Sequence, residues 1–172
     1  MSKDEILYLR KIKHTDTKDI IRWRNDDNIK KFFIYQKDIT EEGHLKWIKE
    51  MIDTGKAVQF IICNSDDNAK IGSVYLRDID IINRKAEFGI FIGEREYLGR
   101  GYGRIATKQI LEYGFNELRL HKIFLRVLLD NIQAIKAYRS VGFVEEGIFR
   151  DDVLINNKYR DIMFMSIVDP NE

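Results

Sequence analysis

Three glycines at alternate positions form the part of this chain best suited to binding chemistry. Gly99, Gly101 and Gly103 follow an apolar run at 88–92 and open an amphipathic stretch from about 104 to 118. A helix N-terminus presents backbone N–H groups that have no intrahelical partner, and the helix dipole is positive there. Glycine tolerates φ > 0 and lets a ligand approach the backbone without meeting a Cβ. The sequence therefore predicts a phosphate-binding cradle at this turn.

Other interpretations of the loop fit less well. A Walker-type loop needs Gly-Lys followed by Ser or Thr, which the chain lacks. The short dinucleotide-binding pattern is met by Gly101, Gly103 and Ala106, with Asp130 at the end of the next predicted strand. That fold uses its fingerprint to open a long run of βα units, whereas this loop lies past the middle of the chain. A plain turn would not need three alternate glycines at a helix start.

Apolar periodicity predicts the elements that position the loop. Strands are predicted at 6–13, 58–63, 71–76, 85–92, 122–129, 144–154 and 159–167. A helix that carries Ile20, Ile21 and Trp23 is predicted with Thr15 or Asp16 as its N-terminal cap, and further helices are predicted at 41–52, 104–118 and 132–141. The sequence thus predicts an α/β fold, with a mixed sheet of about seven strands and about four flanking helices.

Three further expectations concern connections within this fold. The apolar run after 71–76 is expected to continue through Ile79, Ile81 and Ile82. The pair Asn156-Asn157 suits a hairpin turn of left-handed residues. The helix at 104–118 is expected to form a right-handed βαβ crossover. With no linker-like segment in the sequence, we predict a single domain over residues 1–172.

Composition narrows the classes of partner. Of the 172 residues, 44% are apolar and 33% charged, and the net charge of +1 gives no field that would favour nucleic acid. No apolar run is long enough to span a bilayer, and the N-terminus has no hydrophobic segment behind a basic start. Cys63 is the single cysteine, and the three histidines are scattered, so neither a disulfide nor a metal site is predicted. We expect a cytoplasmic protein without a nucleic-acid or membrane partner.

A second cluster of residues makes the interpretation of the loop specific. Asp130-Asn131, Ala134, Tyr138 and Gly142-Phe143 follow the loop motif Leu98-Gly99-Arg100-Gly101-Tyr102-Gly103. The two motifs together resemble the cofactor motifs of the GNAT superfamily of acyl-CoA-dependent N-acetyltransferases, and the resemblance extends over nearly the whole chain. It implies a GNAT-like fold, with acetyl-CoA as the cosubstrate and no metal.

The resemblance also implies where coenzyme A would bind. In the family its pyrophosphate lies on loop amides, which here belong to Leu98, Gly99, Arg100, Gly101, Tyr102, Gly103 and Arg104. The family usually has Gln or Arg where this chain has Leu98, so the resemblance implies backbone donors here without that side-chain contact. Nearby positive charge comes from Arg95, Arg100, Arg104 and Lys108. Pantetheine would pair with the strand before the loop, at Ile90, Phe91 and Ile92.

Candidate catalytic residues follow from the same resemblance. Tyr138 occupies the position of the usual general acid, and a phenol stays protonated at neutral pH. Asn131 either binds pantetheine or caps the helix that contains Ala134, and Ala134 belongs to the same cofactor motif. Glu87 is the candidate base, because it precedes the segment expected to bind the thioester; a base acting through water is the alternative. His44 is a candidate contact for the acceptor.

The acceptor is less well defined by the sequence. Two segments, Arg22-Trp23-Arg24-Asn25 and Glu42-Gly43-His44-Leu45-Lys46-Trp47, are similar to enzymes that acetylate nucleotide-linked amino sugars, and Arg22 and Arg24 could meet a nucleotide phosphate. Two others, at 84–90 and 157–161, are similar to polyamine acetyltransferases. Both patterns also occur in ribosomal-protein alanine acetyltransferases. We predict a small-molecule amine, with an amino sugar ahead of a polyamine. Two alternatives are left open: an N-terminal peptide as the acceptor, and a non-catalytic acyl-CoA sensor as the function. A homo-oligomer is left open as well.

Overall fold

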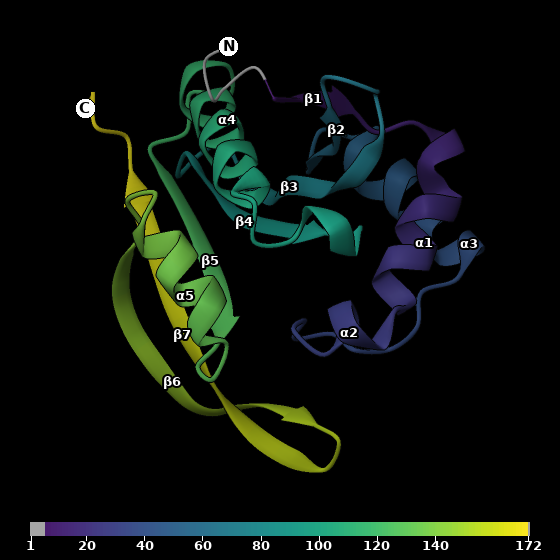
Figure 1. Ribbon diagram of the computed structural model, residues 1–172. Helices are drawn as coiled ribbons and strands as arrows, with labels where there is room; N and C mark the ends of the chain where they lie inside the picture. The colour runs from purple at the N-terminus through teal and green to yellow at the C-terminus, as the bar shows by residue number, and fades with distance from the viewer. Residues whose placement is uncertain (1–5, 172) are drawn as a thin grey trace.

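The computed structural model describes residues 6–171 and contains one seven-stranded sheet (Figure 1). The strand order is β1-β2-β3-β4-β5-β7-β6. The strands are β1 Leu7–Lys11, β2 Val58–Asn64, β3 Lys70–Asp80, β4 Lys85–Ile92, β5 Lys122–Leu128, β6 Val144–Ile155 and β7 Lys158–Val168. All pairings are antiparallel except the one between β4 and β5. The α/β fold and the seven strands predicted from the sequence are therefore confirmed.

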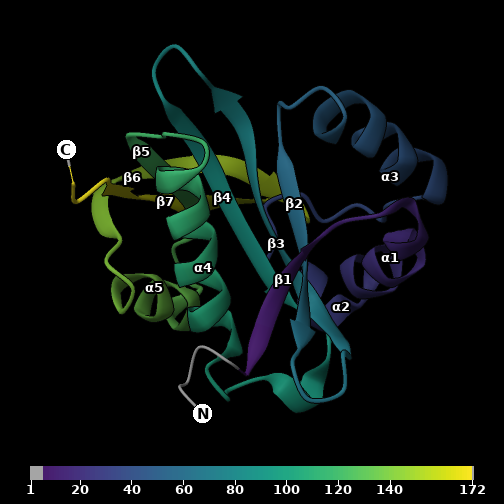
Figure 2. The same ribbon diagram turned by 90° about the horizontal axis from the view of Figure 1, so that it is seen from above.

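Helices cover both faces of the sheet (Figure 2). On one face lie α4, which is Tyr102–Asn116, and α5, which is Ile132–Arg139; α1, α2 and α3 lie on the other. These three are Thr17–Asn25, Asp27–Lys30 and Glu41–Trp47. The described residues thus contain five α-helices where about four were predicted, because the short α2 has no apolar periodicity. The predicted helix at 41–52 is α-helical to Trp47 and then forms a π-helical turn, Ile48–Ile52.

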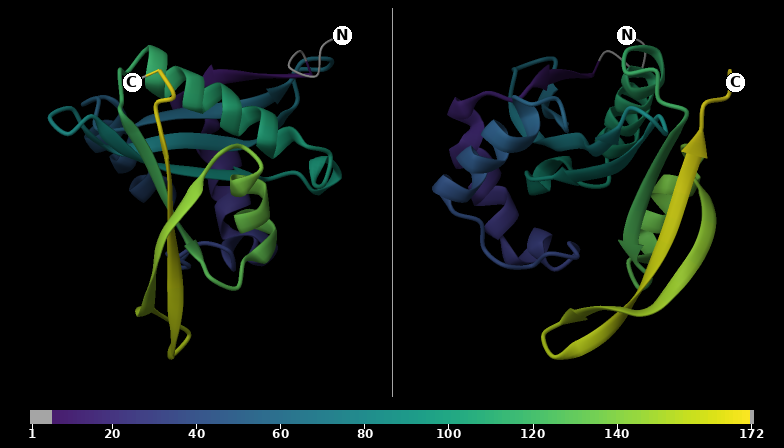
Figure 3. Two further views of the ribbon diagram at one scale, coloured as in Figure 1. Left: turned by 90° about the vertical axis from the view of Figure 1, so that its left-hand side faces the viewer. Right: turned by 180° about the vertical axis from the view of Figure 1, so that it is seen from behind.

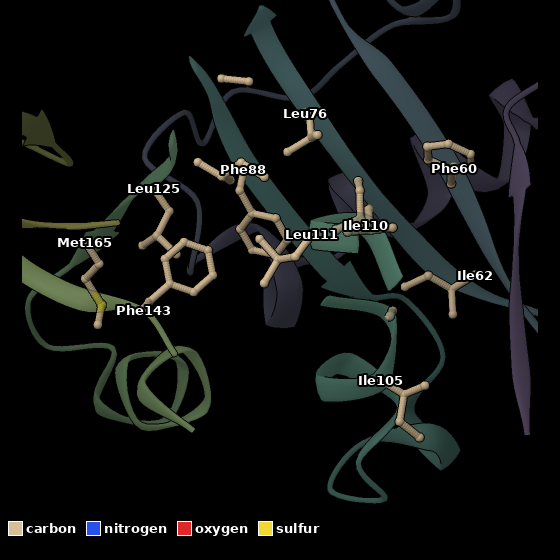
Figure 4. Packing of buried hydrophobic residues seen from close by; sticks show 14 of the residues in the cluster. Phe60, Ile62, Leu76, Phe88, Ile105, Ile110, Leu111, Leu125, Phe143 and Met165 are labelled. Atoms are coloured by element: carbon tan, nitrogen blue, oxygen red, sulfur yellow. The ribbon is translucent and has the colours of Figure 1, made fainter. Parts of the chain in front are cut away.

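The continuous apolar runs arise because the central strands are buried on both faces. In β2, Phe60 and Ile62 belong to the cluster under α4, whereas Ile61 and Cys63 pack with Trp23 of α1. Figure 4 shows the α4 side of this core, where Ile110 lies between the sheet residues Leu76 and Ile62. Burying each such aliphatic side chain contributes about 1.5–3 kcal/mol. The apolar contacts therefore fix α4 and α1 against opposite faces.

Two local expectations are wrong. Ile81 and Ile82 do not extend the strand, because β3 ends at Asp80 and the two side chains are 81% and 92% exposed. The carboxylate of Asp80 accepts a hydrogen bond from Asn83 N at 2.9 Å, which closes the turn. Asp16 precedes α1, but its side chain makes no cap hydrogen bond to that helix. By contrast, Asn156 and Asn157 have φ of 50° and 59°, as predicted for the hairpin turn.

The sheet opens between its two halves, at the pairing of β4 with β5. These strands are in register only at Lys85–Glu87 and Lys122–Phe124, and α4 provides the crossover between them. Beyond Glu87 the two strands separate, and β5 runs away with β7 and β6 (Figure 3). The C-terminal part of β4 therefore has a neighbour, β3, on one side only.

Candidate active site

A cavity of about 850 Å³ occupies the opening between β4 and β5. Its walls come from the end of β4, the middle of β5, the start of α4, the inner face of α5 and the segment after α1. A smaller hollow of about 400 Å³ lies under α3 and shares Arg24, Tyr35, Tyr75, Arg77 and Phe91 with the first. The two hollows together provide room for a long ligand and an acceptor that meet in the middle.

Backbone groups on one edge of β4 face this cavity. Gly93 N donates to Ile71 O at 2.7 Å, so Gly93 is directed toward β3. Because successive N–H groups of a strand alternate between its edges, those of Ile90 and Ile92 point to the opposite, open edge. The backbone N–H of Phe91 points toward β3, and its side chain packs edge-on against Trp23 and Phe33. A main-chain role toward a ligand thus fits Ile90 and Ile92 and not Phe91.

The glycine loop has the geometry of an anion cradle. Gly99 and Gly101 have φ of 71° and 88°, and a Cβ on either would meet no atom within 4 Å. The first recorded helical hydrogen bonds of α4 are donated by Arg104 and Ile105 to Gly101 O. The amides from Gly99 to Gly103 are therefore free of helical acceptors, whereas Leu98 N donates to Arg95 O at 3.1 Å. Gly103 is different: it lies in the first turn of α4, where its Cβ would be 4.0 Å from Ile92 Cγ1.

Basic side chains surround the cradle. Arg104 and Arg95 line the cavity, and Arg95 Nη2 lies 3.7 Å from Asp26 Oδ2. Arg100 and Lys108 are exposed on the loop and on α4. Leu98 is 56% exposed and lines the cavity without a polar side-chain group, and its backbone N–H already donates to Arg95 O at 3.1 Å. The positive end of α4 and these cations have the charge that would suit a polyphosphate.

Tyr138 lies on α5 and lines the cavity. Its ring packs edge-on against Phe88, with ring centroids 5.8 Å apart, and against Phe143 at 5.9 Å. Burial raises the pKa of the Tyr138 phenol well above its ordinary value. The hydroxyl therefore remains protonated at neutral pH and can donate a proton to a leaving group.

Asn131 and Ala134 stand at the start of α5, on the same wall. The side chain of Asn131 caps the helix, since its Oδ1 accepts a hydrogen bond from Ala134 N at 3.3 Å. The Nδ2 group remains a donor on the cavity side. Capping is thus confirmed, and it leaves the second alternative, a hydrogen bond to pantetheine, available to the same side chain.

Glu87 lies at the point where β4 and β5 separate, but its surroundings are those of an ion-pair centre. Arg77 Nη2 and Arg126 Nε each lie 3.0 Å from its Oε1, and its side chain is 7% exposed. Burial alone would raise the pKa of Glu87, but the hydrogen bonds from Arg126 and Arg77 hold it below its usual value. A carboxylate held this way is a weak base. The structure therefore disfavours Glu87 as the base and makes it a positioning group for two arginines.

The residues predicted on the acceptor side differ in their placement. Arg22 is occupied by Glu94 and Asp19, and it lines neither hollow. Arg24 lines both hollows. His44 is buried, lines the smaller hollow, and lies 3.0 Å from Thr17 Oγ1 through its Nδ1. Burial lowers the pKa of His44 to about 4, so its imidazole is neutral near pH 7.

Several lining residues escaped the sequence analysis, among them Phe33, Tyr35, Tyr75, Arg77 and Arg126. They come from three different parts of the chain: the segment after α2, β3 and β5. Arg77 is opposite Glu87 in the β3–β4 register, and Arg126 lies two residues beyond the last β5 position paired with β4. Only a knowledge of strand register could have grouped them.

The fold and site define the class of protein. Residues 7–144 match the family model of the acetyltransferase (GNAT) domain, and the chain belongs to this family. It is an acetyl-CoA-dependent N-acetyltransferase that transfers the acetyl group to a small-molecule primary amine. Among the described residues, no cluster of side chains could hold a metal ion, and no helix is long and apolar enough to cross a membrane.

Relatives and solved structures agree with this assignment. The chain is 34% identical to spermidine N(1)-acetyltransferase of Vibrio cholerae, over 94% of this chain and 92% of that protein. It is 41% identical to spermidine N(1)-acetyltransferase of Escherichia coli K12, over 59% and 54% of the two proteins. A crystal structure of the Vibrio cholerae enzyme with CoA and spermine aligns with a TM-score of 0.88 and 31% identity, covering 95% of each chain. A dodecameric structure from the same species aligns with a TM-score of 0.81 and 30% identity, covering 95% and 94%.

Proposed function

We propose that coenzyme A binds along the cradle and the open edge of β4, and that the amine enters from the side of α1–α3. The observation that supports this is the opening between β4 and β5, which joins the cradle to the hollow under α3. Of the loop amides predicted at 98–104, those from Gly99 to Gly103 would hold the pyrophosphate, since Leu98 N and Arg104 N already donate to Arg95 O and Gly101 O; Arg104 and Arg95 would lie beside it. The backbone groups of Ile90 and Ile92 would pair with pantetheine as an added strand would.

In this arrangement Tyr138 acts as the general acid. The amine nitrogen forms a bond to the acetyl carbon, and the carbon–sulfur bond breaks. The phenol of Tyr138 gives its proton to the departing thiolate and regains one from solvent. A backbone N–H of Ile90 or Ile92 stabilises the negative charge on the carbonyl oxygen as the bond forms. Water removes one proton from the incoming ammonium before the attack and a second from the same nitrogen as the amide forms, since the Glu87 carboxylate is held by Arg77 and Arg126.

Two acceptor classes have support from different observations. The relatives favour a polyamine, because two of them are named for spermidine. The hollow under α3, which we call the acceptor hollow, favours an amino sugar that carries negative charge, because Arg24 and Arg77 line it. A peptide N-terminus has no comparable support from the lining residues.

Release of free thiol from acetyl-CoA, measured over a panel of amines, tests this function. The panel contains spermidine, a nucleotide-linked amino sugar, an amino-sugar phosphate and an alanine-terminated peptide. We expect release with one of the first three, together with mass-spectrometric detection of the N-acetyl product. Tight binding of acetyl-CoA without thiol release for any amine would instead support a non-catalytic sensor.

We also propose that the chain forms a homo-oligomer, as the dodecameric neighbour does. β6 is an edge strand with exposed apolar residues, including Val144, Ile148, Phe149 and Leu154, which are 49–62% exposed. An edge strand of this kind is a ready template for association. Light scattering coupled to gel filtration gives the mass directly, and a monomer at micromolar concentration would contradict this proposal. The cytoplasmic location stays a prediction of the sequence analysis.

A further inference from the structure

Arg24 is the unusual charge in the acceptor region. It lines both hollows, and its Nη1 is buried without a hydrogen-bond partner. The guanidinium carbon lies 3.4 Å from the centroid of the Phe33 ring, so the aromatic face supports the group without neutralising it. Its recorded hydrogen bond is a long one, from Nη2 to Tyr35 O at 3.5 Å. A half-buried guanidinium whose buried Nη1 has no anionic partner is unfavourable, and a ligand anion would remove that penalty.

The acidic residues nearby do not neutralise Arg24. Glu87 is bound by Arg77 and Arg126, each at 3.0 Å. Asp38, which lines the smaller hollow, pairs with Lys30 Nζ at 2.7 Å. Burial lowers the pKa of Arg24, and the nearby charge of Arg77 adds to this effect. The region is therefore short of negative charge, which is the reverse of what a polycation requires.

The rim of the larger cavity adds a flat apolar surface. Phe32 and Tyr35 line it and are 51% and 58% exposed. Exposed aromatic rings beside a cationic group are suited to stacking against a planar ring, such as a nucleobase.

We propose that Arg24 binds a phosphate of the acceptor, which is a primary amine linked to a nucleoside diphosphate or to a simpler phosphate ester. The proposal rests on the acetyltransferase function above and specifies its substrate class. Arg24 is here a substrate-binding residue: its planar fork can hold two phosphate oxygens, while Phe33 fixes the plane of the guanidinium. The amine would then be held toward β4, and spermidine would be a poor substrate.

Calorimetric titration of the CoA-saturated protein with uridine diphosphate tests this directly, because bound CoA already fills the cofactor cradle. We expect binding to the parent protein and an affinity lower by about 10–100-fold in Arg24→Gln. Arg24→Lys keeps the charge, so its affinity for uridine diphosphate should lie between those of the parent protein and Arg24→Gln. Arg22→Gln is the matched control, since Arg22 is 57% exposed and lines neither hollow. Thermal melts verify that each variant is folded. Uridine and inorganic phosphate as separate probes distinguish stacking from phosphate binding.

Kinetics provide the second readout. With a nucleotide-linked amino sugar, Arg24→Gln should raise the acceptor KM about 10–100-fold and leave the KM of acetyl-CoA unchanged. Equal binding of uridine diphosphate by the parent and Arg24→Gln would overturn the assignment of Arg24. Higher kcat/KM for spermidine than for every phosphorylated amine would overturn the substrate class. Arg24-dependent binding with no acetyl transfer to any amine would overturn the proposed function and retain the phosphate site.

Discussion

Tyr138 and Glu87 line the same cavity, yet their surroundings have opposite effects on their acidity. Burial against Phe88 and Phe143 raises the pKa of the phenol, so Tyr138 keeps its proton. The guanidiniums of Arg126 and Arg77 lower the pKa of the carboxyl, so Glu87 stays charged. At the scale of single residues, the environment therefore favours Tyr138 as a proton donor and disfavours Glu87 as a proton acceptor.

Tyr138→Phe should reduce kcat about 10²–10³-fold, because general-acid assistance is lost while ring packing is kept. The dissociation constant for CoA should change little, since the phenyl ring still fills the same space between Phe88 and Phe143. Steady-state kinetics and calorimetry measure the two quantities. A variant as fast as the parent would restrict Tyr138 to a packing role.

The pH dependence should follow the amine and not Tyr138. The raised pKa keeps the phenol protonated on the alkaline side, so its loss as an acid should not appear below about pH 10. An alkyl amine becomes a better nucleophile as it loses its proton, so kcat/KM should rise from about pH 6 to pH 9. A pH–rate profile with saturating acetyl-CoA checks this. A fall in rate between pH 8 and pH 9 in the parent that disappears in Tyr138→Phe would contradict it.

Glu87→Gln distinguishes a base from a positioning group. Loss of the charge leaves Arg77 and Arg126 close together without their shared carboxylate. Both arginines are about one-third exposed, so we expect a modest loss of about 1–3 kcal/mol in the free energy of unfolding. The shape of the pH–rate profile should remain that of the parent. Disappearance of an acidic limb from the profile would instead identify Glu87 as the base.

At the scale of elements, the loop between β4 and α4 combines two different requirements for glycine. Gly101 has a left-handed φ of 88°, so the backbone itself requires it. Gly103 is helical, and a Cβ at this position would lie 4.0 Å from Ile92 Cγ1. A side chain at either position would occupy the space in which a ligand approaches the loop amides.

Gly103→Val and Gly101→Val separate these requirements. Both should weaken CoA binding by about tenfold or more, because a branched side chain blocks the approach of the pyrophosphate. Gly101→Val should also lose about 1–3 kcal/mol of stability through its positive φ, whereas Gly103→Val should change stability by less than about 0.5 kcal/mol, because valine has a higher helix propensity than glycine and its Cβ would meet only Ile92 Cγ1 at 4.0 Å. Calorimetry and urea unfolding measure the two effects. Gly147→Ala is the control, since its Cβ would meet nothing within 4 Å and its φ is not positive. Unchanged CoA affinity in folded Gly103→Val would contradict the assignment of the cradle.

At the scale of the whole molecule, Asp16 joins three separate elements. Its buried carboxylate accepts two hydrogen bonds from Arg10 of β1 and forms an ion pair with Lys70 of β3 at 2.8 Å, just before α1 begins. Burial would raise the pKa of Asp16, but hydrogen bonds from Arg10, Lys70 and Lys13 N hold it far below its usual value. This carboxylate ties the face that carries the acceptor hollow to the sheet.

Asp16→Asn should lower the free energy of unfolding by about 2–4 kcal/mol at pH 7, because Arg10 and Lys70 lose their shared partner. The lowered pKa means that this stabilisation is present above about pH 4 and is lost as the pH falls toward the folded-state value. The parent should therefore lose more stability than Asp16→Asn between pH 5 and pH 3. Urea unfolding at several pH values measures this, and parallel losses in the two proteins would contradict it.

Much of the framework follows from short-range order in the sequence. The bounds of β4 were predicted, and α4 begins and ends within two residues of its prediction, because apolar periodicity and the glycine turn act over a few neighbours. The same holds for the Asn156-Asn157 turn, where the backbone conformation depends on the two residues themselves. The loop that we propose as the cofactor cradle is therefore the part of the site that the sequence determines.

The tertiary structure decided which side chains meet. Strand register brings Arg77 and Arg126 to Glu87 and turns a candidate base into an ion-pair centre. Pairing with β3 directs the backbone of Phe91 away from the opening, while the separation of β4 from β5 exposes Ile90 and Ile92. Packing against Phe33 leaves Arg24, and not Arg22, facing the acceptor hollow. These contacts join residues distant in the chain, and a one-residue change of register would reverse the face of every side chain in a strand.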